Sequence, residues 1–212
     1  MTIPKLHYIS QGNSAKEHLD NIQKACSSGA ELVQLRLKDG SEKKILKSAM
    51  TAREITAHFQ TRLIIQDDYK IAKAVKADGV HLGPSDVRAS IAVKSLYTWQ
   101  MIGGTAHTLE DCEILKDEVD FISLGPFKFS ETKAPLPKLL GLEGYRVILD
   151  ILKTDTPILA VGGITLEDVP DLLATGVSGL AVSGTITRDF NAITAFNKLL
   201  KASSTAEQRH TF

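Results

Sequence analysis

The sequence predicts a single-domain α/β protein folded as a (β/α)8 barrel of the TIM type. Eight short, β-rich apolar runs recur along the chain, and a glycine or a polar cluster closes each of them. A stretch with helical spacing follows each run. The 212 residues divide into repeats of about 26, enough for one strand, one helix and two turns. Strands that alternate with helices pair in parallel through right-handed crossovers, and eight such units close most economically into a barrel.

The expected strands end where the apolar run meets a turn residue. They are residues 6–10, 32–35, 63–65, 79–82, 101–103, 121–124, 157–161 and 179–182. The expected helices carry apolar residues three and four positions apart. They are residues 15–28, 42–58, 69–75, 88–95, 109–115, 143–152, 166–174 and 192–201. Residues 202–212 are polar and aperiodic, so we expect a barrel domain over residues 1–201 and a frayed C-terminal tail.

An open, doubly wound sheet is the alternative fold. It is disfavoured because no Gly-x-Gly-x-x-Gly follows the first strand. Polar residues also follow nearly every strand, whereas an open sheet gathers them at one switch point. The barrel therefore remains the preferred interpretation.

Composition excludes several classes of protein. Hydrophobic residues make up 43% and charged residues 24% of the chain, which is the ordinary globular mixture. Lys plus Arg and Asp plus Glu both number 25, so no overall field attracts a polyanion and nucleic acid is not an expected partner. The start of the chain lacks the pattern of a secretory signal, and no window approaches 18 uninterrupted apolar residues. We expect a cytoplasmic protein without a membrane partner.

The common metal and nucleophile motifs are missing from the sequence. Cys26 and Cys112 form neither a disulfide framework nor a metal-spaced pair, so both are expected to be buried small hydrophobes. No His-Glu-x-x-His, Cys-x-x-Cys or Gly-x-Ser-x-Gly occurs. His81 and His107 are expected to be hydrogen-bonded structural histidines.

The active site of a barrel lies at the C-terminal ends of its strands, so the residues leaving each strand are the candidates. Gln34, Arg36 and Lys38 alternate with leucines after the second strand, and alternation points them to one side. Two cations and an amide would then converge in the barrel mouth. The alternative is a strand end whose long side chains reach toward water.

Carboxylates follow the third and fourth strands. Asp67 and Asp86 come from neighbouring strand ends, where carboxylates can meet the demands of octahedral magnesium. Magnesium prefers one or two carboxylates together with phosphates and waters. The alternative makes Asp68 and Asp86 helix N-caps, and for Asp68 we favour the cap.

Phosphate groups have two candidate binding regions. Ser130, Thr132 and Lys133 lie in the longest connection, after the sixth strand, and hydroxyls with a lysine suit phosphate oxygens. A solvated surface loop has the same composition. Gly162-Gly163 and Ser183-Gly184 follow the seventh and eighth strands, where barrels often hold a phosphate. The alternative is that these glycines serve only tight turns.

Taken in order, these motifs resemble the thiamine phosphate synthase family over about residues 5–190. The matching segments are Gln34-Leu-Arg-x-Lys38, Asp67, Gly79-Val-His-Leu-Gly83 with Asp86, Gly103-x-Thr105-x-His107, Gly125-Pro with Glu131-Thr-Lys133, Val161-Gly-Gly-Ile164 and Gly179-x-Ala-Val182. The resemblance implies a (β/α)8 barrel and a transferase of thiamine biosynthesis. Its reaction joins 4-amino-5-hydroxymethyl-2-methylpyrimidine diphosphate to 4-methyl-5-(2-phosphoethyl)thiazole, releases diphosphate and uses Mg²⁺.

The resemblance also implies roles for individual residues. Binding of the pyrimidine diphosphate falls to Gln34, Arg36, Lys38, Gln66, Thr105 and Lys133. Apart from the resemblance, we expect Arg36, Lys38 and Lys133 to be catalytic, because their charges would stabilise the departing diphosphate. Binding of the thiazole phosphate falls to Ser130, Thr132, Gly163, Ser183 and Gly184. Asp67 and Asp86 would hold Mg²⁺. A homo-oligomer is possible.

This chain departs from the family pattern at several positions. Gln66 stands where asparagine is usual, Pro84 where glutamine is usual, Thr105 where serine is usual, Ser130 where threonine is usual, and Val182-Ser183-Gly184 shifts the usual serine by one. Two rival functions stay open. One is the related thiazole tautomerase, an isomerase that would use His107 or another base and no metal. That branch resembles a form of the barrel without the two magnesium aspartates, so the presence of both Asp67 and Asp86 in this chain favours the synthase. The other is a non-catalytic barrel that binds phosphate ligands.

Overall fold

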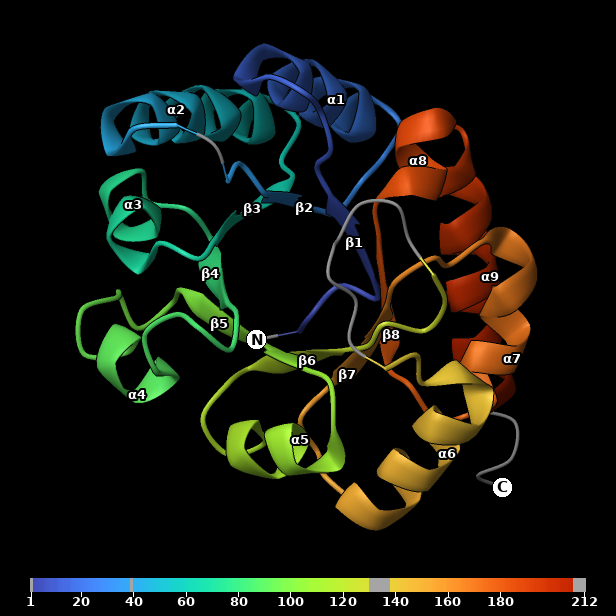
Figure 1. Cartoon of the computed structure of the whole chain (residues 1–212). Coiled ribbons are helices and arrows are strands. Elements are labelled where there is room, and N and C mark those ends of the chain that lie inside the picture. The colour runs from blue at the N-terminus through green and yellow to red at the C-terminus, as the bar shows by residue number, and fades with distance from the viewer. Residues whose placement is uncertain (1, 39, 130–137, 208–212) are drawn as a thin grey trace.

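The computed structural model describes residues 2–38, 40–129 and 138–207, the last six as backbone alone. Eight parallel strands close into one barrel in sequence order, β1 to β8, and β8 pairs with β1 (Figure 1). The strands are β1 (Leu6–Ile9), β2 (Leu32–Leu35), β3 (Arg62–Gln66), β4 (Gly79–Leu82), β5 (Met101–Ala106), β6 (Phe121–Leu124), β7 (Ile158–Val161) and β8 (Gly179–Val182). The predicted fold class is confirmed.

The helices form a ring outside the barrel (Figure 1). They are α1 (Ala15–Ser27), α2 (Glu42–His58), α3 (Tyr69–Ala74), α4 (Ala89–Ala92), α5 (Leu109–Leu115), α6 (Gly141–Leu152), the 3₁₀ turn η1 (Leu166–Asp168), α7 (Val169–Leu173), α8 (Gly184–Arg188) and α9 (Ala192–Glu207). Each parallel strand pair is therefore crossed over by helical structure, as the alternating sequence pattern predicts.

Several boundaries differ from the sequence prediction. The helix expected over 88–95 is only the single turn α4, and the one expected over 166–174 divides into η1 and α7, with Pro170 in the first turn of α7. Proline lacks an N–H and is tolerated at such a position. The last helix reaches Glu207, so the expected start of a tail at residue 202 is wrong for its first six residues. Residues 208–212 lie outside the described part.

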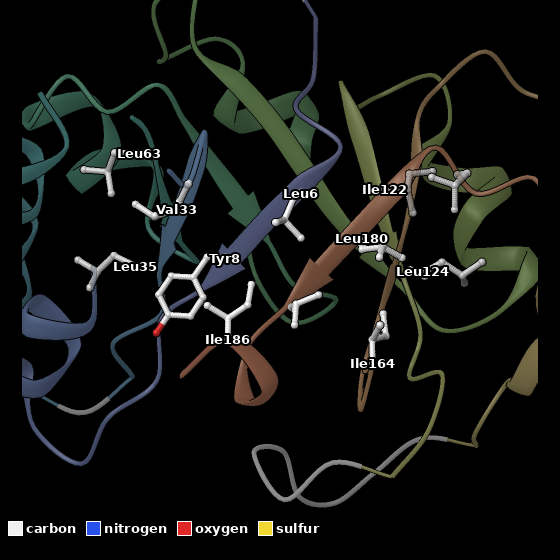
Figure 2. Close-up of a cluster of buried hydrophobic side chains, with 14 of the residues drawn as sticks. Leu6, Tyr8, Val33, Leu35, Leu63, Ile122, Leu124, Ile164, Leu180 and Ile186 are labelled. Atoms are coloured by element: carbon white, nitrogen blue, oxygen red, sulfur yellow. The ribbon is translucent and has the colours of Figure 1, made fainter. Parts of the chain in front are cut away.

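The main apolar core lies between the sheet and the helices. Figure 2 shows Leu6 and Tyr8 of β1, Val33 of β2 and Leu180 of β8 among its members. Alternate strand residues point into the barrel instead, because successive side chains of a strand face opposite ways. There the rings of His7 and His81 both contact Phe121. The polar mouth is therefore built on a packed, two-sided sheet.

Cys26 and Cys112 are free and buried, as predicted. Burial raises the pKa of the Cys112 thiol to about 12. Among the described helices, none combines the length and the apolar character that crossing a bilayer would need.

Candidate active site

Gln34 and Gln66, at the C-terminal ends of β2 and β3, meet through their side chains. Gln34 Nε2 donates a hydrogen bond to Gln66 Oε1, and Gln66 Nε2 donates to Asp67 Oδ1. The Gln34 side chain is buried inside the mouth of the barrel. A chain of two amides therefore orients the Asp67 carboxylate.

Arg36 and Lys38 bring positive charge to the same mouth. Leu35 precedes Arg36 and Leu37 separates Arg36 from Lys38. Leu35 belongs to the apolar core and Leu37 packs against it, as the predicted alternation requires. The Arg36 N–H donates to Ser10 Oγ at 3.1 Å, which ties this segment to the end of β1. Burial lowers the pKa of the Arg36 guanidinium, and the charge of Asp67 opposes that shift. The guanidinium is thus close enough to the Asp67 carboxylate for their charges to interact.

Asp67 and Asp86 approach one another across the ends of β3 and β4. The backbone of Asp67 is left-handed, with φ of 69°, and its N–H donates to the His81 carbonyl at 2.8 Å. Asp86 Oδ2 accepts a hydrogen bond from the Gly83 N–H at 2.7 Å. Burial raises the pKa of the Asp86 carboxyl, the Gly83 N–H lowers it, and the charges of Asp67 and Lys38 raise and lower it respectively. Two repelling carboxylates and two cations therefore share the mouth.

The alternative interpretation as a helix N-cap is correct for Asp68 and wrong for Asp86. Asp68 caps α3, where its Oδ1 accepts from the N–H groups of Lys70 and Ile71 at 2.8 and 3.0 Å. Asp86 is not the N-cap of α4, since Arg88 occupies that position. The Asp86 carboxylate therefore stabilises the turn after β4 and faces the charged groups of the mouth.

The donor set suits magnesium better than a metal that needs a full protein cage. In the described ranges, His, Cys, Asp and Glu side chains form no group of three or more able to surround an ion. Asp67 and Asp86 supply two hard carboxylates whose mutual repulsion a cation would relieve. One or two carboxylates completed by waters and substrate phosphates is the arrangement Mg²⁺ prefers.

A hydrogen bond to His81 positions the side chain of Thr105 on β5. His81 Nε2 and Thr105 Oγ1 are 2.9 Å apart, so the threonine hydroxyl is held from inside the barrel. His107 Nδ1 hydrogen-bonds the Gly125 carbonyl, and the His107 N–H donates to Asp111 at 2.8 Å. Both histidines are hydrogen-bonded within the fold, as the sequence predicted.

Three predicted site residues, Ser130, Thr132 and Lys133, lie outside the described residues. The segments on either side of them, however, are joined by backbone hydrogen bonds. The Leu140 N–H donates to the Pro126 carbonyl at 3.0 Å, and the Gly141 N–H donates to the Phe127 carbonyl at 3.2 Å. These bonds form a stem that closes the connection between β6 and α6.

An ion pair joins that stem to the turn after β7. Lys128 Nζ lies 2.5 Å from Asp168 Oδ1. The other Asp168 oxygen accepts from the N–H and the hydroxyl of Thr165, both at 3.0 Å. The Lys128 N–H also donates to the Gly162 carbonyl at 3.1 Å. Asp168 therefore serves both as a turn cap and as the partner of the stem.

Gly163, Ser183 and Gly184 lie together on the turns after β7 and β8. Gly163 has a φ of 64°, and a Cβ there would lie 2.5 Å from the Phe129 carbonyl oxygen. Glycine is thus required by the turn and by the stem that packs on it. Thr185 Oγ1 donates to the Ile164 carbonyl at 2.6 Å, which fastens the two turns together.

Three features of the site were missed from the sequence. The short helix α8 (Gly184–Arg188) was not predicted, because five residues cannot show a helical period. The capping role of Asp168 was also missed, although Thr165 three residues earlier is a recognisable capping pattern. Arg188, at the end of α8, was likewise not a candidate.

Two cavities lie away from this mouth, at the N-terminal ends of the strands. One of about 550 Å³ lies between α6 and the turn that follows α7, and is lined by Arg146, Thr156 and Ser178, among others. The other, of about 380 Å³, is lined by residues that include Pro4, Asp120 and Ser178. Neither contains a predicted site residue, so they do not compete with the mouth as the catalytic centre.

Comparisons with known proteins identify the family. A family model described as thiamine monophosphate synthase matches residues 6–186. The thiamine-phosphate synthase of Flavobacterium psychrophilum is 42% identical over 205 residues, which cover 92% of this chain and 98% of that protein. A second, from Flavobacterium johnsoniae, is 42% identical over 187 residues and covers 86% and 88%. The solved thiamine phosphate pyrophosphorylase from Pyrococcus furiosus superimposes with a TM-score of 0.79 at 25% identity, covering 94% of this chain and 96% of that one. This chain belongs to the thiamine monophosphate synthase family.

Proposed function

We propose that this chain is a transferase of thiamine biosynthesis, a thiamine-phosphate synthase. It joins 4-amino-5-hydroxymethyl-2-methylpyrimidine diphosphate to 4-methyl-5-(2-phosphoethyl)thiazole and forms thiamine phosphate and diphosphate. The observation that carries this function is the meeting of Asp67 and Asp86 with Arg36 and Lys38 at one mouth. A mouth of this kind suits a diphosphate and its metal ion.

The pyrimidine diphosphate binds on the β2 to β5 side of the mouth. Gln34, Gln66 and Thr105 offer amides and a hydroxyl to the aminopyrimidine. Asp67 and Asp86 hold Mg²⁺, which when bound neutralises charge on the diphosphate. Arg36 and Lys38 complete this side by binding diphosphate oxygens. Lys133 is assigned to the diphosphate from the sequence resemblance.

The thiazole phosphate binds on the opposite side, at the turns after β7 and β8. Gly163 and the Ser183-Gly184 backbone supply N–H groups, and Ser130 and Thr132 are assigned hydroxyl donors from the resemblance. The link from Thr185 to Ile164 supports this assignment because it holds the two turns at a fixed separation.

Catalysis is a dissociative substitution. The bond from the pyrimidine methylene carbon to the diphosphate oxygen breaks and its electron pair leaves with the diphosphate; the thiazole nitrogen then forms the new C–N bond. Arg36, Lys38 and Lys133 stabilise the negative charge that accumulates on the leaving group. Electron donation by the aminopyrimidine supports the cationic carbon, so no protein nucleophile is required. Alignment of the two substrates supplies much of the remaining rate.

Residues 1–201 form the catalytic domain in this proposal, and the reaction takes place in the cytoplasm. The partners are the two small-molecule substrates. The balanced charge of the chain, 25 cations and 25 anions, supports the expectation that nucleic acid is not among them.

The decisive experiment is an assay of the purified protein with both substrates. We expect thiamine phosphate and diphosphate in equal amounts, loss of both on chelation with EDTA, and recovery when excess Mg²⁺ is added. Thiazole isomerisation that persists in EDTA would favour the tautomerase. Stoichiometric ligand binding without turnover would favour the non-catalytic barrel.

A further inference from the structure

We propose that Arg188 binds the phosphate of the thiazole substrate and selects the phosphorylated thiazole over its alcohol. The inference deepens the proposed function and rests on it. Arg188 is the last residue of α8, and its side chain folds back along the helix toward Gly184. A Cβ at position 184 would lie 3.1 Å from Arg188 Nη1. The guanidinium therefore occupies the space that a side chain at position 184 would fill.

Neighbouring groups place the guanidinium beside the turn after β8, close to residues that follow β1 and β7. The same Cβ position lies 3.7 Å from Gln11 Oε1, which follows β1. Arg188 Nη2 donates to Thr185 Oγ1 at 3.5 Å, and Thr185 is the residue bonded to Ile164 on the turn after β7. The positive charge thus lies beside the turns assigned to the thiazole phosphate.

The charge of Arg188 is available to a ligand. Within the described ranges, no carboxylate comes within ion-pair distance of the Arg188 guanidinium. Asp189, the next residue in the chain, accepts hydrogen bonds from the side chain and N–H of Asn191, and Asp168 on the turn after β7 pairs with Lys128. An exposed arginine without a carboxylate partner can offer its planar donors to a phosphate.

The described phosphate turns need such a charge. Gly163, Ser183 and Gly184 contribute N–H groups and a hydroxyl but no charged side chain, whereas a phosphate monoester carries close to two negative charges at pH 7. The sequence of this turn is consistent with a charge supplied by Arg188. The usual serine of the family pattern is shifted by one position, and glycine stands at position 184. Glycine there leaves room for the guanidinium.

The test measures binding of the thiazole phosphate and of the thiazole alcohol by titration calorimetry. We expect Arg188→Gln to weaken binding of the phosphate about ten- to hundredfold, as the loss of a hydrogen bond to a charged group does. Binding of the alcohol and the KM of the pyrimidine diphosphate should change less than twofold. Arg188→Lys should restore part of the affinity, and Arg146→Gln on α6 is the matched control.

Gly184→Ser tests the spatial argument. We expect it to weaken phosphate binding when Arg188 is present and to cost much less in the Arg188→Gln background, because only the guanidinium competes for that space. Wild-type protein that binds the phosphate no better than Arg188→Gln does, or costs that simply add, would overturn the inference while leaving the synthase function intact. Wild-type protein that neither binds the phosphate nor makes thiamine phosphate would instead refute the proposed function.

Discussion

Asp67 and Asp68 are neighbours with the same side chain, and the backbone gives them different tasks. The left-handed conformation of Asp67 accompanies a carboxylate held by Gln66 near Asp86. The extended conformation of Asp68 directs its carboxylate onto the first N–H groups of α3. The sequence suggested both roles, because one residue follows a strand and the other precedes a helix. The link through Gln66 depends on side-chain reach and was not predictable.

Asp67→Asn tests the metal assignment at this scale. Asparagine tolerates a left-handed backbone and can still accept the Gln66 hydrogen bond, so the fold should persist. Loss of the carboxylate should lower kcat at least about a hundredfold, since it removes charge stabilisation aimed at the leaving group. Binding of the thiazole phosphate should change less than twofold. Steady-state kinetics over a range of Mg²⁺ concentrations and calorimetry provide the measurements.

The matched control is Asp68→Asn, which changes the adjacent carboxylate. Asparagine is as good an N-cap as aspartate, so both kcat and the free energy of unfolding should be nearly unchanged. Near-normal turnover of Asp67→Asn at saturating Mg²⁺ would show that Asp67 is not a metal ligand.

At the scale of elements, the strands were predicted better than the short helices. Every expected strand is present, and β2, β4, β6 and β8 have the expected bounds, because glycines and polar clusters end the apolar runs sharply. The strand expected over 101–103 continues to Ala106, since pairing with β6 stabilises the backbone of Gly103 and Gly104 despite the low strand preference of glycine. The short α8 was missed because tertiary contacts, not a periodic pattern, stabilise it.

Asp168→Ala tests which contact holds the turn after β7. Asp168 caps the turn through Thr165, and loss of such a cap lowers the free energy of unfolding by about 1 kcal/mol, within a range of 0.5–2. The ion pair with Lys128 involves a half-exposed lysine, and pairs of that kind contribute about 0.2–1 kcal/mol. Lys128→Met should therefore cost clearly less than Asp168→Ala. Urea unfolding of both single variants and the double variant measures each contribution; equal losses would mean that the ion pair, not the cap, dominates.

At the scale of the whole molecule, the even charge count conceals a local sorting of charge. The barrel brings Arg36 and Lys38 to the carboxylates of Asp67 and Asp86, although the total charge is zero. The order of the motifs along the chain was enough to predict the barrel and to group these residues, because strand ends of a parallel barrel share one rim. The contents of the barrel interior were not predictable, since the inward positions hold both imidazoles, such as that of His7, and apolar rings, such as that of Phe121, so polarity does not separate the two faces of a strand.

His7 inside the barrel makes stability depend on pH. Burial lowers the pKa of the His7 imidazole from 6.5 to about 3, and the charges of His81 and Arg62 act in the same direction. The unfolded chain therefore binds more protons than the folded chain between those pH values. The contribution of His7 to the free energy of unfolding is fully present above about pH 6.5 and is lost as the pH falls toward 3. At pH 4.5 the loss should be about 2–3 kcal/mol. Urea unfolding at pH 7.5 and 4.5 measures it, and His7→Phe should remove this part of the pH dependence while the exposed His58→Gln should not. An unchanged pH dependence in His7→Phe would show that other buried groups, such as His18, carry the effect.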